Sequence, residues 1–149
     1  MSQIKISGKL SNYIDENFGV NQGGVLSPFL FVEFLKDLGK FFKDTGIVLN
    51  DEEIFNYLLW EDDLVLLSST PEGLQSLLDS LYDFTKQWHL IVTTLKTKVM
   101  IISGAKRTQS ITFTINAIII EQVHEYKYLG CIIADRRNIT EKCCCTVCK

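Results

Sequence analysis

The 149-residue chain lacks several features that would place it in a large protein class. No apolar run approaches the roughly 18 residues that cross a bilayer, which argues against a membrane protein. The N-terminus has no basic segment followed by an apolar one, so we expect an intracellular chain without a secretion signal. The sequence also lacks an internal repeat, a phosphate-binding P-loop, a dinucleotide-binding glycine pattern and a serine elbow. Repeat architectures and those enzyme classes therefore have no support.

Cysteine is present but unevenly distributed. Cys131 lies in an apolar run, whereas Cys143, Cys144, Cys145 and Cys148 fall within the last seven residues. An odd number of cysteines without a secretion signal indicates reduced thiols. Cys145 and Cys148 have the spacing of half a zinc site, but the second pair of ligands is missing. The sequence favours a frayed tail without function, and a small zinc-binding module is the alternative.

Charge is divided between the two parts of the chain, although the net charge is only -3. Residues 1–95 hold 6 basic and 14 acidic side chains, whereas residues 96–149 hold 9 basic and 4 acidic ones. Such a division fits a metal-binding centre beside a phosphate-binding flank, and it also fits two differently solvated faces. The apolar content of 46% is that of a globular domain with a core.

Hydrophobic spacing predicts two long helices. Ser27 and Pro28 form a helix start, and apolar residues then recur at helical spacing as far as Phe42. The same cap-then-proline device at 69–71 opens the clearest helix, which we expect to end near Trp88. We expect both helices to pack on one face of a sheet.

Strand-like segments occupy most of the remaining chain. Residues 3–18 and 54–67 each predict a hairpin, and alternating apolar residues between 90 and 133 predict further strands, one of them over 126–133. Helices mixed with strands joined by short connections indicate an α+β fold with an antiparallel sheet.

Three acids, Glu61, Asp62 and Asp63, follow one another at the expected tip of the second hairpin. Like charges so close together repel unless a cation relieves them. Successive strand residues point to opposite faces, so Asp62 and Asp63 would face one ion only if the turn bends them. Taken alone, the pattern indicates solvated acids, or a magnesium site completed by phosphate oxygens.

Four segments of the chain, taken in order, resemble known sequence blocks. GVNQGGVLSP at 19–28 looks like GVRQG-x-x-LSP, and LLWEDDLVLLS at 58–68 is similar to LLYADDLVLLS. Residues 90–100 resemble L-x-V-N-x-x-KT-x-x-M, and YKYLGCII at 126–133 resembles F-x-YLG-x-x-I. In this order the blocks are those of the non-LTR (LINE-type) retrotransposon reverse transcriptases, which the chain therefore resembles. The resemblance implies that residues 1–139 form part of a polymerase palm and the start of the thumb connection, whereas residues 140–149 form a cysteine-rich tail unrelated to the family.

The chemistry implied by this resemblance is RNA-directed DNA synthesis. Two Mg²⁺ ions would align a DNA primer 3'-hydroxyl with an incoming deoxynucleotide on an RNA template. Carried over residue by residue, Asp62 would be the main metal ligand and Asp63 the supporting acid. Lys96 would lie at the nucleotide phosphates.

The resemblance also implies substrate contacts outside the acidic hairpin. Gln22 and Gly23 would line the nucleotide and template pocket, where glycine lets the backbone approach the substrate closely. Tyr128, Leu129 and Gly130 would form the strand that supports the primer end.

The sequence departs from the family pattern at several positions. The strand that carries the family's first metal aspartate lies upstream of the residues present here, and Trp60 and Glu61 replace a tyrosine and a small residue. Asn21 and Thr93 replace an arginine and an asparagine. We therefore expect that the chain alone does not extend a primer. The alternative is a non-catalytic remnant that binds RNA or a protein through its basic part, which includes Lys96, Lys98, Lys106, Arg107, Arg136 and Arg137.

Overall fold

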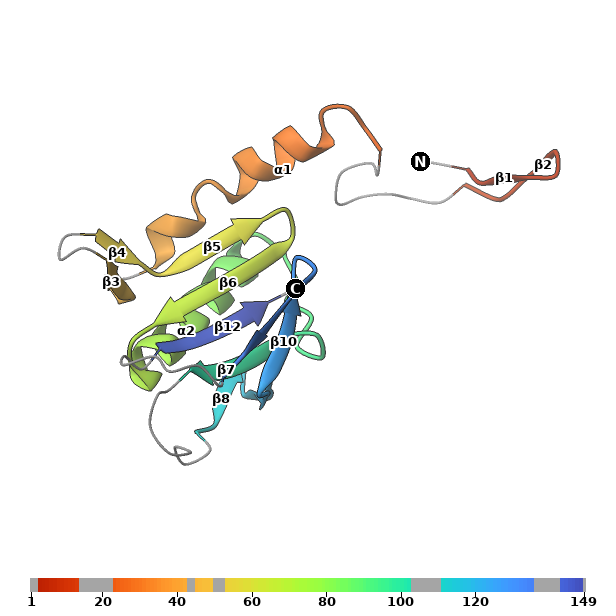
Figure 1. The fold of residues 1–149 in the computed structure, drawn as a ribbon. Helices are drawn as coiled ribbons and strands as arrows, with labels where there is room; N and C mark the ends of the chain where they lie inside the picture. Colours follow the sequence, from red (N-terminus) through yellow and green to blue (C-terminus); the bar gives the residue numbers. More distant parts are fainter. Residues whose placement is uncertain are drawn as a thin grey trace. The chain divides into compact units, whose positions relative to one another are not determined.

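A computed structural model describes residues 3–13, 23–42, 45–49, 53–102 and 111–135, together with the backbone of 143–148 (Figure 1). The chain divides into two compact units, Met1–Leu35 and Lys36–Lys149. Helices are mixed with small sheets, which confirms the α+β class expected from the sequence. No helix in the described part of the chain is long and apolar enough to cross a bilayer.

The first unit contains a short hairpin of strands β1 (Lys5–Ile6) and β2 (Lys9–Leu10). Its turn residues, Ser7 and Gly8, have φ values of 49° and 81°. Positive φ at both central positions is what a tight type I' turn requires. The observed hairpin therefore closes within Lys5–Leu10, in the first half of the segment 3–18 that was expected to form it, and residues 14–18 of that segment lie outside the described ranges.

The first long helix expected from the sequence is divided in the structure. Helix α1 spans Ser27–Leu35, and a separate 3-10 helix, η1, spans Leu38–Phe41 in the second unit. Gly39 lies inside η1, where glycine weakens a helix, and a Cβ atom there would lie 2.9 Å from the Tyr57 hydroxyl. The prediction of an unbroken helix as far as Phe42 was wrong, because hydrophobic spacing does not reveal this break.

A six-stranded sheet in the order β5-β6-β12-β7-β9-β8 forms the centre of the second unit, and β3–β4 and β10–β11 are separate two-stranded ribbons. Neighbouring strands of the sheet are antiparallel except β7 and β9, which are parallel, so the sheet is mixed and the expectation of an antiparallel sheet was too simple. The strands are β3 (Ile47–Leu49), β4 (Glu53–Phe55), β5 (Tyr57–Trp60), β6 (Asp63–Ser68), β7 (Lys98–Ile102), β8 (Phe113–Ile115), β9 (Ile118–Gln122), β10 (Glu125–Tyr128), β11 (Cys131–Ala134) and β12 (Cys143–Cys148).

The cysteine-rich segment forms a central strand of this sheet. β12 pairs antiparallel with β6 on one side and with β7 on the other, so that Cys145 lies opposite both Leu67 and Met100 (Figure 1). The expectation of a frayed end was therefore wrong. β6 and β7 run parallel, because each is antiparallel to β12, and the connection between them includes a helix. This split arrangement leaves a space one strand wide, which β12 fills.

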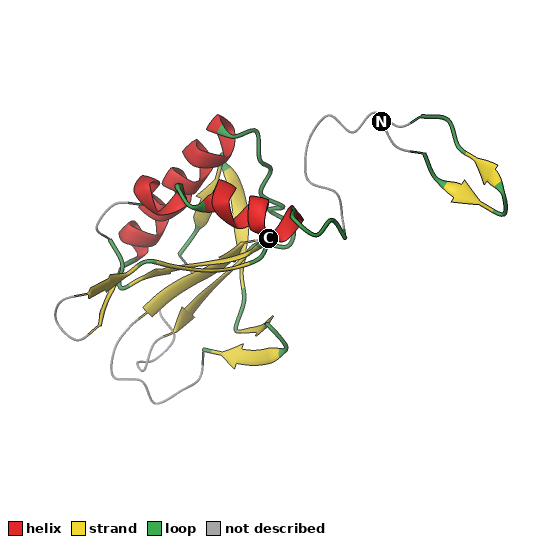
Figure 2. Cartoon of the chain, turned by 90° about the horizontal axis from the view of Figure 1, so that it is seen from above, coloured by secondary structure: helices red, strands yellow, loops and turns green. Residues whose placement is uncertain are grey.

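Helix α2 (Pro71–Gln87) covers one face of the sheet, as the view from above shows (Figure 2). The Thr70 side-chain oxygen accepts a hydrogen bond of 3.1 Å from the Gly73 N–H, and Pro71 follows the cap, as the sequence predicted. The helix contacts β6 and β8 and places an apolar stripe in the core, formed by Leu74, Leu77, Leu78, Leu81 and Phe84.

The β10–β11 ribbon covers the opposite face. Val65 of β6 and Met100 of β7 are buried there. Partly buried side chains pack against them, namely Leu67, Ile102, Tyr126, Tyr128 and Ile133. At the base of the ribbon, Nδ1 of His124 lies 2.5 Å from a carboxylate oxygen of Asp135, and the Asp135 N–H donates to the His124 carbonyl. The sheet is therefore covered on both faces.

Candidate functional site

The acidic hairpin of β5 and β6 closes with a two-residue turn. Trp60 lies opposite Asp63, which leaves Glu61 and Asp62 in the turn, and Glu61 has a φ of 51°. Asp62 is exposed, whereas Asp63 is half-buried as the first residue of β6. The structure thus confirms a hairpin with acids at its tip. The two aspartates have different backbone settings, because one lies in the turn and the other in the strand.

The amino ends of β6 and β7 lie at the same edge of the sheet. Val147 of β12 is in register with Val65 on one side and with Lys98 on the other, so Val65 and Lys98 are separated by two strand spacings, about 10 Å. Asp63 is the first residue of β6, whereas Lys96 lies in the turn before β7, where its N–H donates to the Thr93 carbonyl. The edge therefore combines the acidic turn with the exposed Lys96 side chain.

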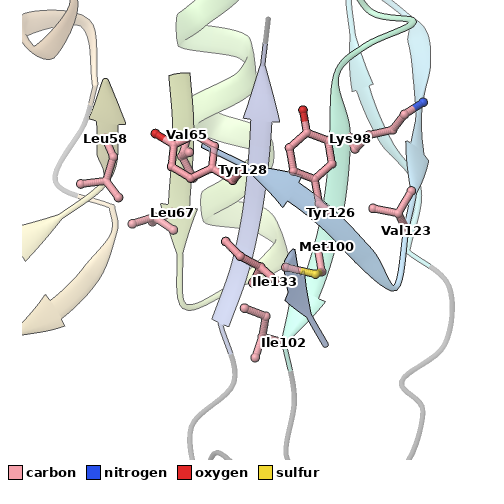
Figure 3. A pocket seen from close by; sticks show the side chains of 10 residues that line it. All are labelled: Leu58, Val65, Leu67, Lys98, Met100, Ile102, Val123, Tyr126, Tyr128 and Ile133. Carbon is pink, nitrogen blue, oxygen red and sulfur yellow. The ribbon is translucent and has the colours of Figure 1, made fainter. Parts of the chain in front are cut away.

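A cavity of about 160 Å³ lies between the sheet and the β10–β11 ribbon, on the face opposite α2 (Figure 3). Its lining comes from strands β5, β6, β7 and the ribbon, with one residue from the β9–β10 connection. The lining residues are Leu58, Val65, Leu67, Lys98, Met100, Ile102, Val123, Tyr126, Tyr128 and Ile133. The Lys98 amine donates a 2.5 Å hydrogen bond to the Glu121 carboxylate, which leaves the cavity largely apolar.

Tyr128 links this cavity to the acidic hairpin. Burial of the ring raises the pKa of the Tyr128 hydroxyl, and the negative charge of Asp63 raises it further. Both effects disfavour the phenolate, so the hydroxyl stays protonated and can act as a hydrogen-bond donor. Sequence reasoning assigned Tyr128 to the primer end but did not predict its proximity to Asp63. No local pattern could have indicated it, because the two residues are far apart in the chain.

Leu129 and Gly130 form a turn, not a strand. β10 ends at Tyr128, which pairs with Cys131 of β11, and the two intervening residues have φ values of 47° and 85°. The prediction of one strand over 126–133 was therefore wrong. Positive φ at both positions is again typical of a tight hairpin turn, which here projects an exposed Leu129 side chain.

The remaining predicted residues are only partly described. Gly23 belongs to the first unit and has a φ of 82°, a conformation that glycine adopts without strain. Gln22 lies outside the described residues. The same holds for four of the cations assigned to RNA binding, Lys106, Arg107, Arg136 and Arg137.

The donor set at the acidic turn suits a hard divalent cation. Asp62 and Asp63 supply carboxylate oxygens, and Mg²⁺ is commonly held by one or two carboxylates together with water and phosphate oxygens. Within the described ranges no three or more histidine, cysteine, aspartate or glutamate side chains form a complete metal cage.

Comparison with known proteins places this arrangement in a family. The model of the family "Reverse transcriptase (RNA-dependent DNA polymerase)" matches residues 2–133. The match spans most of the chain and includes the acidic hairpin, Lys96 and the β10–β11 ribbon. The chain belongs to the reverse transcriptase family.

Its relatives specify the kind of reverse transcriptase. The chain is 32% identical over 131 residues to the RNA-directed DNA polymerase from mobile element jockey of Drosophila funebris, and 28% identical over 141 residues to that of Drosophila melanogaster. These alignments cover 82% and 90% of this chain but only 14% and 15% of the relatives. They confirm the non-LTR retrotransposon resemblance read from the sequence. No solved structure gives a significant match.

Proposed function

We propose that the second unit is the acidic-hairpin part of a polymerase palm, which binds a divalent cation and nucleotide phosphates at the edge formed by β6 and β7. The observation that carries this proposal is that Asp63 begins β6 and Lys96 lies in the turn before β7, at the same edge of the sheet. A cation held by the acids and the Lys96 ammonium group could contact neighbouring phosphates of one nucleotide. The family membership supports the same assignment.

In this proposal Asp62 and Asp63 have different tasks. The exposed Asp62 carboxylate can reach a metal ion in solvent, whereas Asp63 is half-buried near Tyr128. Reverse transcriptases use divalent metal, and a pair of Mg²⁺ ions supplies stabilisation of the attacking and leaving oxygens when bound. The chain's own residues would hold a metal at Asp62, fix Asp63 in the strand and bring Lys96 to the phosphates.

The nucleic-acid partners follow from the same assignment. We infer that an RNA template and a DNA primer pass the edge of the sheet, with the primer end near the β10–β11 turn. Two features support this placement. The turn exposes Leu129, and the preceding Tyr128 lies near Asp63. For Gln22 and Gly23 the family resemblance implies contacts with the nucleotide and template.

We further propose that the chain alone does not extend a primer. The acidic turn itself supplies two metal-binding aspartates, and Glu61 adds a third negative charge where a phosphate must approach. Like charge at that point disfavours the close approach of a phosphate to the turn that the transfer reaction requires, even where the phosphates are bound at the edge.

Metal binding tests the assignment of the turn. Mn²⁺ titration of the full chain, followed by electron paramagnetic resonance, should show a site whose affinity falls about tenfold or more in Asp62→Asn, because a carboxylate ligand is lost. Glu53→Gln is the matched control, since Glu53 is an exposed acid on β4, in the separate β3–β4 ribbon and outside the acidic turn. Equal Mn²⁺ affinity in the parent chain and Asp62→Asn would contradict the proposed site.

Primer extension tests the second part of the proposal. On an RNA template with a DNA primer, in Mg²⁺ or Mn²⁺, we expect no template-dependent incorporation by the full chain. Incorporation that Asp62→Asn abolishes would overturn the proposed inactivity while supporting the role of Asp62. The two measurements therefore separate metal binding from catalysis.

A further inference from the structure

The extended backbone of β12 restricts the chemistry of its cysteines. In a strand the rise is about 3.3 Å per residue, so the Cα atoms of Cys145 and Cys148 lie about 10 Å apart. A disulfide requires Cα atoms within about 7 Å of each other. Both residues belong to the paired strand, Cys145 opposite Leu67 and Met100, and Cys148 opposite Leu64. The extended backbone of β12 is therefore incompatible with a disulfide between positions 145 and 148.

Removal of β12 would leave its neighbours without a replacement partner. β6 pairs with β12 over Leu64–Ser68, and β7 pairs with it over Lys98–Ile102. The two neighbours are separated by two strand spacings, about 10 Å, which is too far for direct hydrogen bonds between them. Their backbone groups that face β12 would be exposed, including those beside the acidic turn.

We propose that β12 is a thiol-controlled strand, in which pairing within the sheet and a Cys145–Cys148 disulfide exclude each other. The reduced segment completes the sheet, whereas the oxidised segment must leave it to bring the Cα atoms of positions 145 and 148 within about 7 Å of each other. This inference is independent of the polymerase assignment, because it rests on the register of β12 alone.

The oxidation requires a small-molecule disulfide such as oxidised glutathione. The thiolate of one cysteine attacks the S–S bond, forms a mixed disulfide and releases one glutathione thiolate. The second thiolate then attacks the protein sulfur of the mixed disulfide and releases the other glutathione. The protein loses two electrons and two protons overall, and the oxidant is reduced to two molecules of glutathione. A dithiol such as dithiothreitol reverses the reaction.

Because pairing of β12 and the disulfide exclude each other, folding should slow the oxidation of the cysteine pair, and oxidation should weaken the sheet. Because the bridge forms only after β12 leaves the sheet, the folded chain should oxidise more slowly than the unfolded chain. Conversely, a bridged chain should lose the protection from hydrogen exchange that β12 gives to β6 and β7. A cysteine pair that has no effect on strand pairing would show neither effect.

The experiment uses the full chain carrying Cys131→Ser, Cys143→Ser and Cys144→Ser, which leaves only the relevant pair. With oxidised glutathione, we expect the Cys145–Cys148 bridge, measured by intact mass, to form about tenfold or more slowly in buffer than in urea. In the purified bridged protein, the amides of β6 and β7 should exchange about tenfold or more faster, and dithiothreitol should restore their protection. The same background with Cys148→Ser is the matched control, which cannot form the bridge. Its unmodified fraction, separated from the mixed disulfide with glutathione and identified by intact mass, should keep its protection.

Equal oxidation rates in buffer and urea would overturn the proposal. A bridged protein whose β6 and β7 amides remain protected would also overturn it. If the triple-serine variant does not fold, the parent chain provides the same test, with the 145–148 bridge identified by peptide mapping and exchange measured on the same amides.

Discussion

At Glu61 the backbone adopts a φ of 51°, a left-handed conformation that costs most side chains free energy. The residue closes the hairpin that carries the two aspartates, so the local strain is located at the proposed metal-binding turn. The cost arises from contact between Cβ and the backbone, and glycine avoids it. The sequence alone did not indicate this strain, because glutamate is not a residue typical of such a position.

Substitutions at Glu61 separate this strain from the charge. Glu61→Gly and Glu61→Ala both remove the carboxylate, but only glycine relieves the left-handed conformation. We expect the free energy of unfolding of Glu61→Gly to exceed that of Glu61→Ala by about 0.5–1 kcal/mol, after the greater entropy of the unfolded glycine chain is included. Urea denaturation measures the difference, and equal stability of the two variants would contradict it.

The Tyr128 hydroxyl reports on the placement of Asp63. We expect Asp63→Asn to lower the pKa of Tyr128 without restoring its ordinary value, because burial is the larger cause of the shift and remains. Asp62→Asn, which changes the exposed neighbour, should leave the pKa unchanged. Tyrosinate absorbance during alkaline titration, with Tyr128→Phe to identify the signal, measures the effect. A pKa of Tyr128 that is unchanged in Asp63→Asn would contradict the described proximity.

The raised pKa of Tyr128 also predicts how the stability of the folded chain changes with pH. The pKa of Tyr128 is raised in the folded chain, so the folded state retains this proton more tightly than the unfolded state does. Its contribution to stability is complete below the ordinary tyrosine pKa of about 10 and is lost as the pH rises through the folded-state pKa. Denaturation midpoints above pH 10 should therefore fall more steeply in the parent chain than in Tyr128→Phe.

At the scale of the element, the start of α2 depends on the close approach of the Gly73 backbone to the side chains of Ser68 and Thr70. Gly73 lies where a Cβ atom would clash with the Ser68 hydroxyl oxygen and would lie 3.0 Å from the Thr70 hydroxyl oxygen. Ser68 is buried, and its oxygen accepts a 3.2 Å hydrogen bond from the Thr70 N–H. The side chains of the Thr70 cap and of Ser68 at the end of β6 thus occupy the space that a Cβ atom at Gly73 would need.

Gly73→Ala should destabilise the chain by about 1–2 kcal/mol, although alanine normally favours a helix by about 1 kcal/mol over glycine. The reason is the clash with Ser68. The double variant Ser68→Ala/Gly73→Ala should recover part of this loss, because the clashing oxygen is gone. Thermal unfolding of the parent, the two single variants and the double variant measures the coupling. Additive effects of the two substitutions would contradict it.

Elements that depend on residues close together in the sequence could be predicted from it. The cap at Thr70, the apolar stripe of α2 and an acidic hairpin all follow from local spacing, and the structure contains them. The hairpin was expected over 54–67, but it begins only at Tyr57, because residues 54 and 55 belong to β4 of a separate ribbon. The position of β12 and the proximity of Tyr128 to Asp63 depend on contacts between distant residues, for which one sequence carries no signal. The turn at Leu129 and Gly130 was missed because a lone glycine inside an apolar run does not reveal a bend.

At the scale of the whole molecule, the second unit depends on its last strand. Thr146 lies in the middle of β12, opposite Leu66 of β6 and Val99 of β7. Both of these partners are buried in the core. A central strand must donate hydrogen bonds to its neighbours, and proline in such a position removes a donor and distorts the strand.

We therefore expect Thr146→Pro to destabilise the second unit by about 3 kcal/mol or more, through loss of the donor and the distortion of β12. Thr146→Val is the matched control, because it keeps the N–H and the β-branched shape and should stay folded. Circular dichroism during urea denaturation measures the difference. A proline variant as stable as the valine variant would show that β12 does not complete the sheet.

The position of β12 has a consequence for how the protein matures on the ribosome. Every other strand of the central sheet precedes β12 in the sequence, yet β6 and β7 become neighbours only through it. While residues 143–148 are still inside the exit tunnel, the emerging chain can form the acidic hairpin and α2 but cannot close the sheet around them. Closure must wait until β12 has left the tunnel, and until then the unpaired flanks of both strands remain available to chaperones and to aggregation.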